Sequence, residues 1–438
     1  MKVSEVIFRD DLYPRINTSV PTVQKYAEDL SVLPPITVNQ RGELIDGWHR
    51  WTAHKKNGEE NIESVVVETT SDAHLLELAI ETNATHGLQL SQADKQKMAR
   101  TIYSATPMKE RPEKKKHLAK ILSVTLQSVQ SWLSRIDKDN RELRDVTATS
   151  MWMACYSEQE IASAVGMKRQ SLEPLLQKYQ KFGLPAKVGD FGHVQDDTER
   201  LETMQAEYSA AANHETDFDV PIYNVWKQQA KSSDVSHFGN SEVRWLDNLL
   251  YLYTDPFDIV LDPFAGGGST IDICKKRFRR YMVSDRKPIV EREKDIRLHD
   301  IKNGPLKPPQ WKDVRLVYLD PPYWIQAEGQ YSDDPEDLGN QSLEDFTKNL
   351  ATVVKQYASK LSEAYIALII QPTQWKAPNR QFTDHVGDLL RAVKLPVNMR
   401  YSVPYESQQY TAQMVEWAKE NRSCLVLSRE IVVWKVSK

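Results

Sequence analysis

Residues 258–270 read Asp258-Ile259-Val260-Leu261-Asp262-Pro263-Phe264-Ala265-Gly266-Gly267-Gly268-Ser269-Thr270. An apolar strand with β-branched residues therefore enters a three-glycine turn, and the pattern predicts a helix from Thr270 to Arg277. Glycines let a backbone approach a ligand closely, and this succession of strand, turn and helix is typical of a nucleotide-type cradle at the carboxyl edge of a parallel sheet. The stretch predicts an α/β domain with a Rossmann-like sheet.

An acidic residue follows this turn at a sequence distance typical of nucleotide-binding folds. Asp285 lies 23 residues after Asp262, at the end of the next predicted strand, Arg280 to Ser284. A carboxylate in that place suits the hydroxyl groups of a ribose. Ile271 stands where a dinucleotide-binding fold would carry its third glycine.

A second motif ends another predicted strand. The run from Val314 to Leu319 is apolar and delivers Asp320-Pro321-Pro322-Tyr323 at its end. The two prolines remove backbone donors and stiffen the turn. A glycine turn and an Asp-Pro-Pro-Tyr turn in one domain are a far more specific combination than either motif alone.

Together the two motifs resemble those of the DNA amino-methyltransferases, over about residues 220–438. These enzymes use S-adenosylmethionine (SAM) to methylate adenine N6 or cytosine N4. The resemblance implies a Rossmann-like, SAM-dependent methyltransferase domain, with SAM as the cofactor. It implies cofactor contacts from the glycine turn, the two following acidic residues and the segment before the turn: Asp262, Pro263, Phe264, Gly266, Gly268, Asp285, Asp300, Phe238 and Asn240.

The same resemblance implies how the Asp-Pro-Pro-Tyr turn acts. An exocyclic amine is a poor nucleophile because its lone pair is delocalised into the ring. Hydrogen bonds from the amine to the Asp320 side chain and to the Pro321 carbonyl would localise that lone pair, with Pro322 stiffening the turn. Tyr323 would stack on a base extruded from the duplex. Many cytosine N4 enzymes of the family carry serine in place of this aspartate, so Asp320 favours adenine N6.

The first 90 residues form a separate pattern of short β-rich runs and helices. Gly47, Arg50 and Ala53 fall in a G-x-x-R-x-x-A box, which resembles that of the ParB-like N-terminal domains. Relatives of those domains include proteins that bind a nucleotide. A second box of the family appears only as residues 81–86, without its arginine, so nucleotide binding, positioning of DNA and a purely structural role all stay open.

Residues 91–185 are predicted to be helical, with helix-turn-helix spacing at Ala119, Ser123, Val129 and Trp132. The second helix, residues 125–135, would present polar side chains to base edges. A second copy of the spacing follows at residues 160–172, although Pro174 should shorten or kink its second helix. An ordinary helical hairpin remains an alternative. The candidate DNA contacts of both copies and of the lysine run before the first are Gln127, Ser128, Gln130, Lys114, Lys115, Lys116, Lys168 and Arg169.

Charge is segregated along the chain, although the formal net charge is only -4. Residues 95–181 hold 17 Lys and Arg against 9 Asp and Glu, whereas residues 185–220 hold 2 against 9. The basic region suits phosphate contacts. The acidic region reads as a linker with one short helix, residues 197–211.

Composition excludes several classes of protein. The chain has 438 residues, of which 40% are hydrophobic and 27% charged, so it is neither collagen-like nor wholly disordered. Its longest apolar stretch, residues 365–370, is far shorter than the ~20 residues of a membrane helix. Cys155, Cys274 and Cys424 lie far apart, which argues against disulfides and a metal site. We expect a soluble, cytoplasmic protein without a metal or membrane partner.

The expected organisation is a ParB-like domain (1–90), a helical helix-turn-helix region (91–185), an acidic linker (186–219) and a methyltransferase domain (220–438). The favoured function is methylation of a flipped base in double-stranded DNA, with the N-terminal half binding DNA. The alternatives are a non-catalytic ParB-like regulator with a degenerate methyltransferase domain and an RNA methyltransferase. The recognition sequence and formation of a homodimer stay open.

Overall fold

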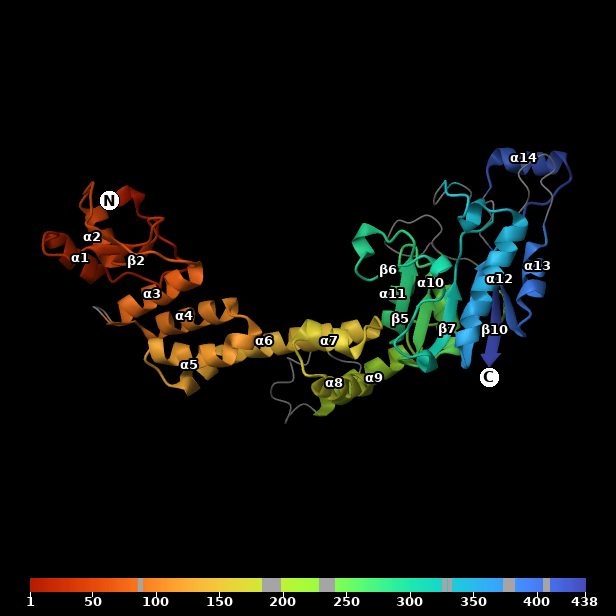
Figure 1. Ribbon diagram of the computed structural model, residues 1–438, viewed down its shortest axis with the longest axis horizontal. Coiled ribbons are helices and arrows are strands. Elements are labelled where there is room, and N and C mark those ends of the chain that lie inside the picture. Colours follow the sequence, from red (N-terminus) through yellow and green to blue (C-terminus); the bar gives the residue numbers. More distant parts are fainter. Residues whose placement is uncertain are drawn as a thin grey trace. The chain divides into compact units, whose positions relative to one another are not determined.

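The computed structural model describes residues 1–85, 90–182, 198–227, 241–324, 329, 333–372, 383–404 and 410–438 (Figure 1). Two of the predicted cofactor contacts, Phe238 and Asn240, lie outside these residues. The chain divides into two compact units, Met1–Leu143 and Arg144–Lys438. The division falls inside a helix, α6, and not in the acidic segment.

Unit 1 begins with a small mixed α/β fold. Its sheet has the order β2-β1-β3, with β2 antiparallel and β3 parallel to β1. Gly47 opens α2 at φ 103°, and a Cβ there would lie 2.6 Å from the Ile36 Cγ2 atom, so glycine is required. The elements are α1 (Val20–Glu28), β1 (Ile36–Val38), β2 (Leu44–Asp46), α2 (Trp48–Lys56), β3 (Ser64–Val66) and α3 (Asp72–Thr85).

The rest of unit 1 is helical, with α4 (Gln92–Ala105), α5 (Arg111–Ile121) and the start of α6 (Leu126–Met153). Ser123 adopts a left-handed φ of 49° in the turn between α5 and α6, where the spacing predicts a tight turn. Val129 is fully buried beneath the pair. The predicted end of the second helix at Arg135 is wrong: α6 continues to Met153, because no glycine or proline interrupts it.

The second helical pair, α7 (Glu158–Val165) and α8 (Arg169–Phe182), belongs to unit 2. Gly166 caps α7 in the left-handed conformation at φ 64°. Pro174 lies inside α8 without shortening it, since the helix runs on for two further turns. Tyr179 of α8 packs against Trp152 and Phe257, with ring centroids 6.2 and 5.7 Å away, and so attaches the pair to the rest of unit 2.

Unit 2 is built on a seven-stranded sheet of order β6-β5-β4-β7-β8-β10-β9. Strands β4 to β8 are parallel, and β10 runs antiparallel between β8 and β9. The edge strand beyond β10 is β9, and residues 424–427 form no strand. The strands are β4 (Ile259–Asp262), β5 (Arg280–Asp285), β6 (Arg297–Leu298), β7 (Val314–Leu319), β8 (Glu363–Ile370), β9 (Val397–Ser402) and β10 (Glu430–Ser437).

Helices cover both faces of this sheet (Figure 1). Leu261 and Leu319 belong to the core beneath α12 and α13, whereas Val260 and Tyr318 belong to the core beneath α10 and α11. This alternation along a strand buries both faces, as a parallel sheet requires. The helices are α10 (Val243–Tyr253), α11 (Ser269–Lys276), α12 (Leu343–Lys360) and α13 (His385–Val393), with α14 (Ala412–Glu420) before β10.

The later part of the predicted linker is attached to unit 2. Residues 198–212 form α9 (Thr198–Ala212), close to the predicted short helix. The buried Arg277 guanidinium donates to the carbonyls of Ala211 and Thr216 at 3.1 and 3.0 Å and to Asp247 Oδ2 at 2.9 Å. These bonds hold the end of α9 and the loop after it on the sheet, so residues 198–217 are no free linker.

Candidate active site

A cavity of about 790 Å³ opens at the carboxyl ends of β4, β5 and β7. The predicted residues that line it are Asp262, Pro263, Phe264, Gly266, Asp285, Asp300, Asp320 and Pro322. The two motifs, separated by more than fifty residues in the sequence, therefore share one cavity. Three other predicted residues are not among the described residues that line the cavity, although each is next in sequence to one that does. These are Gly268, Pro321 and Tyr323.

The glycine turn is organised by Asp262, at the end of β4. Its Oδ1 accepts the Phe264 N–H at 2.9 Å, and its Oδ2 accepts the Thr270 hydroxyl at 2.6 Å. Burial raises the pKa of Asp262 to about 7, partly offset by these two hydrogen bonds. Gly266 and Gly268 have positive φ values of 48° and 80°, which favour glycine. Both Asp262 oxygens thus shape the turn.

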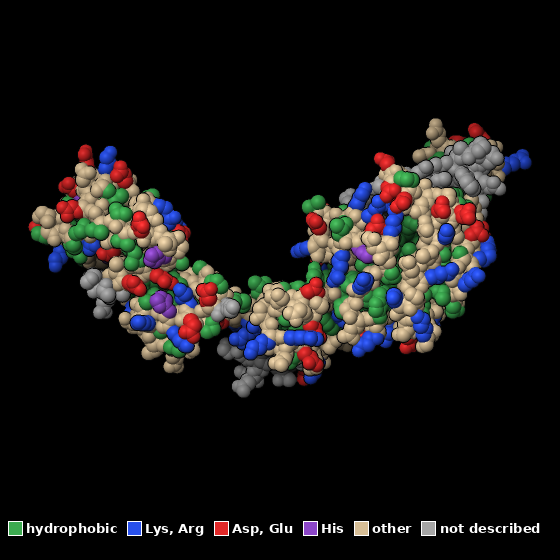
Figure 2. Space-filling model, in the orientation of Figure 1, with side chains coloured by type: hydrophobic (Ala, Val, Ile, Leu, Met, Phe, Trp, Pro, Cys, Tyr) green, Lys and Arg blue, Asp and Glu red, His purple; other side chains and the backbone are tan. Residues whose placement is uncertain are grey.

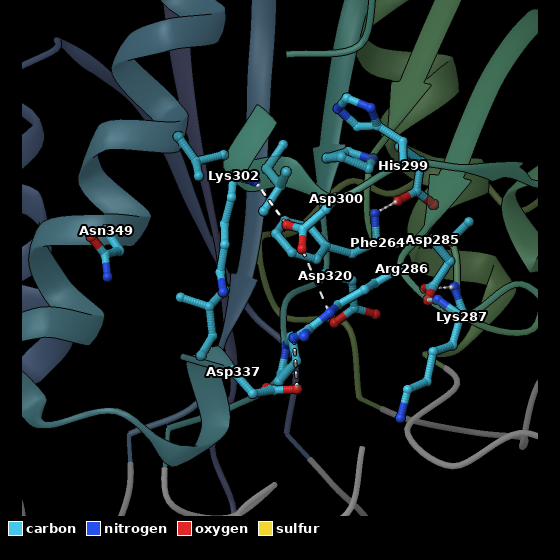
Figure 3. A pocket seen from close by; sticks show the side chains of 18 of the residues that line it. Phe264, Asp285, Arg286, Lys287, His299, Asp300, Lys302, Asp320, Asp337 and Asn349 are labelled. Atoms are coloured by element: carbon cyan, nitrogen blue, oxygen red, sulfur yellow. Dashed lines mark hydrogen bonds and ion pairs between the residues drawn. The ribbon is translucent and has the colours of Figure 1, made fainter. Parts of the chain in front are cut away.

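Asp285, at the end of β5, contacts the turn directly. Its Oδ2 accepts the Gly266 N–H at 3.0 Å and its Oδ1 accepts the Lys287 N–H at 2.8 Å. Two backbone donors fix the carboxylate, and the remaining lone pairs can accept from hydroxyl groups. Asp300 lies opposite, where its Oδ1 accepts the Lys302 N–H at 2.9 Å (Figure 3).

Asp320 lies at the end of β7, as the strand prediction requires. Ser241 Oγ donates to its Oδ2 at 2.6 Å, and the Tyr323 hydroxyl approaches its Oδ1 at 3.4 Å. Burial raises the pKa of Asp320 to about 6, against the hydrogen bond from Ser241, the positive charge of Arg429 and the hydrogen bond from Tyr323. The carboxylate is therefore mostly ionised at neutral pH, with one oxygen bonded tightly and one only weakly.

Sequence reasoning missed five charged residues of the lining, namely Arg286, Lys287, Lys302, Glu336 and Asp337. Arg286 lies between Asp300, 3.6 Å away, and Asp337, 4.0 Å away, and it also pairs with Asp334 (Figure 3). Lys302 pairs with Glu336. These ion pairs attach residues 334–337 to the cavity mouth. Arg286 follows Asp285 directly, and Lys302 lies two residues after Asp300. This closeness in sequence to predicted site residues was the only indication that they line the cavity.

The predicted DNA contacts are divided between the two units. Gln127 and Gln130 are exposed on α6 of unit 1, whereas Ser128 hydrogen-bonds with Thr125 at 2.9 Å and closes the start of that helix. Lys168 and Arg169 are exposed at the start of α8 in unit 2, and Arg169 pairs with Glu158 at 2.6 Å.

The three predicted phosphate-binding lysines each face a carboxylate. Lys114 Nζ lies 2.7 Å from Glu77, Lys115 Nζ 2.5 Å from Asp137 and Lys116 Nζ 2.9 Å from Glu113. Figure 2 shows Lys and Arg interspersed with Asp and Glu on the visible face of residues 1–143. The exposed Lys116 pair is weak, so a phosphate can compete for that lysine, whereas Lys114 and Lys115 are half-buried in their pairs. The local positive charge is therefore smaller than the lysine run suggests.

A family comparison agrees with the first motif. Residues 100–291 match the family model described as DNA methylase, N6_N4_Mtase. The match includes the glycine turn and Asp285 and ends before Asp320. The chain is thus similar to the DNA methylase family over these residues, which make up less than half of its length. The family model covers adenine and cytosine enzymes together and leaves the base open.

Other comparisons return more distant relatives. A stretch of 95 residues, 21% of this chain, is 37% identical to the transcriptional regulator NovG of Streptomyces niveus and covers 29% of that protein. Among solved structures, the chromosome-partitioning protein ParB of Caulobacter crescentus bound to parS aligns over 47% of this chain and 96% of its own, at 15% identity and TM-score 0.22. The pyocyanin biosynthetic protein PhzM aligns over 70% and 98%, at 10% identity and TM-score 0.25.

The TM-scores of these solved structures are too low to support an inference about fold. In the part of the chain that the structure describes, no helix is both long and apolar enough to span a membrane.

Proposed function

We propose that this chain is a SAM-dependent DNA methyltransferase that acts on the exocyclic amine of a flipped base, with adenine N6 as the preferred target. One observation carries the proposal: the glycine turn and Asp320 line the same cavity. The match of residues 100–291 to the DNA methylase family supports it independently.

The lining suits SAM as the cofactor. A cavity of about 790 Å³ can hold a nucleoside with an amino-acid chain, and the positive-φ glycines bring backbone to its wall. In this proposal the turn around Gly266 holds the amino-acid end, Asp285 accepts from the ribose hydroxyls and Asp300 lies near the adenine. Bound SAM supplies an electrophilic methyl group.

The catalytic role of the chain is to prepare the amine. The ionised Asp320 carboxylate accepts one amine hydrogen at Oδ1, and the Pro321 carbonyl accepts the other. These bonds favour a tetrahedral nitrogen whose lone pair points to the methyl group. Tyr323 supplies an aromatic face for the extruded base. Rate enhancement then comes from positioning and electrostatics.

Removal of Asp285 should weaken SAM binding. Asp285→Ala takes away the carboxylate that is held by the Gly266 and Lys287 N–H groups, so we expect an affinity loss of at least about tenfold. Calorimetry of the full chain with SAM checks this. Asp388→Ala, an exposed carboxylate on α13, is the control and should bind SAM normally. Equal affinity in Asp285→Ala would remove Asp285 from the cofactor site.

Methyl transfer should depend on pH through Asp320. Its pKa is raised to about 6, so the acceptor is ionised above that pH and protonated below it. We expect kcat to be level above about pH 7 and to fall about tenfold per pH unit below about pH 6. SAM affinity must be measured over the same range, because the pKa of Asp262 is also raised, to about 7. A level kcat down to pH 5 would contradict the role of Asp320.

The identity of the base is tested by its product. Unmethylated genomic DNA is incubated with the full chain and SAM and then digested to nucleosides. We expect N6-methyladenine, because aspartate heads the catalytic motif. N4-methylcytosine would reverse the choice of base while keeping the reaction class.

A further inference from the structure

The catalytic carboxylate is held by a residue far away in the sequence. Ser241 precedes α10, is only 8% exposed and lines the cavity. Its hydroxyl donates to Asp320 Oδ2 at 2.6 Å, across 79 residues of sequence. By comparison, the 3.4 Å contact of the Tyr323 hydroxyl with Oδ1 is weak. The two oxygens of the Asp320 carboxylate therefore differ, because Oδ2 accepts a short hydrogen bond from Ser241 and Oδ1 has only the weak contact with Tyr323.

The charged groups around Asp320 show how the hydrogen bond from Ser241 affects the ionisation of this carboxylate. Arg429, which stacks 4.4 Å from the Trp245 ring, attracts the ionised carboxylate, whereas Asp262 at the end of the neighbouring strand repels it. Burial raises the pKa of Asp320, and the hydrogen bond from Ser241 is the largest opposing effect, ahead of Arg429 and Tyr323. Loss of this bond would leave less carboxylate ionised at neutral pH.

We propose that Ser241 is a positioning residue for methyl transfer, which fixes Asp320 Oδ2 and so directs Oδ1 to the target amine. The proposal rests on the proposed function, since it assigns Asp320 the amine. It adds that the segment before α10, which the sequence suggests only for cofactor contacts, also orients the catalytic carboxylate.

The test compares Ser241→Ala, Ser241→Thr and the exposed control Ser359→Ala in the full chain. We measure kcat with saturating SAM and DNA from pH 5.5 to 9. Ser241→Ala should lower kcat roughly tenfold at neutral pH and move its acid limb up by about one pH unit. Ser241→Thr should restore the wild-type limb, and Ser359→Ala should not change it.

Three results would overturn the inference. An acid limb in Ser241→Ala that coincides with the wild type would show that the serine does not act on Asp320. A limb that stays shifted in Ser241→Thr would show that the hydroxyl is not the active feature. Absence of methyl transfer by the wild-type chain would overturn the proposed function itself, which distinguishes that failure from the first two.

Discussion

Asp320→Ala should abolish methyl transfer, lowering kcat by at least about a thousandfold. Its carboxylate is the ionised acceptor at the end of β7, and alanine would leave the amine lone pair delocalised. SAM affinity should stay within a few fold, since the predicted partner of Asp320 is the base and not the cofactor. A loss in kcat without a loss in cofactor binding marks an interaction made with the reacting group.

Single-turnover transfer from labelled SAM, together with calorimetry, checks this result. Asp320→Asn is the matched variant, because asparagine keeps the size of the side chain but cannot ionise. Its single oxygen cannot accept from Ser241 and also leave a second oxygen for the amine. Tyr323→Ala should cost less than Asp320→Ala, because stacking positions the base without activating its amine. Retained turnover in Asp320→Ala would refute the mechanism.

Removal of unit 1, residues 1–143, should separate DNA recognition from cofactor binding. Within unit 1, residues 95–143 hold 12 Lys and Arg against 5 Asp and Glu, and the exposed Gln127 and Gln130 lie there too. The shortened chain should bind SAM normally but bind DNA roughly a hundredfold more weakly at low salt. Its affinity should also depend less steeply on salt, since phosphate contacts are lost.

The position of the truncation decides whether unit 2 keeps its complete hydrophobic cores. A cut at residue 185, the end of the predicted helical region, would remove Met153, Cys155 and Tyr179, which are buried in the cores of unit 2. A cut at residue 143 keeps them. Thermal unfolding of residues 144–438 with and without SAM checks that the unit is intact. If residues 144–438 methylate the same sites at the same rate as the full chain, unit 1 does not recognise the DNA sequence.

Substitutions in the full chain separate two kinds of contact in unit 1. Gln127→Ala with Gln130→Ala should change which sites are methylated, because these side chains can reach base edges. Neutralising the three lysines at 114–116 should weaken all sites alike. Methylation mapping distinguishes the two patterns.

The sequence was sufficient for the parts of the site that local chemistry dictates. Positive φ at Gly266, the carboxylate of Asp285 and the stiff turn after Asp320 all follow directly from short motifs at the ends of strands. Parallel strands bring their carboxyl ends to one edge of the sheet, which places the two motifs close together. They line one cavity.

The missed features depend on contacts between distant segments. Ser241 meets Asp320 across 79 residues, and Arg277 holds the end of α9 from 66 residues away. No local pattern distinguishes such residues from other polar ones. The length of α6 was missed because helix-turn-helix spacing fixes where a helix begins and not where it ends.

The most direct test is transfer of a labelled methyl group from SAM to duplex DNA by the full chain, with Asp320→Ala in parallel. If the cavity joins cofactor and target amine, the label should appear on an exocyclic amine, as N6-methyladenine, with the wild type only. Absence of methylated nucleosides with the wild type, while SAM still binds, would contradict the account and favour a non-catalytic DNA-binding protein.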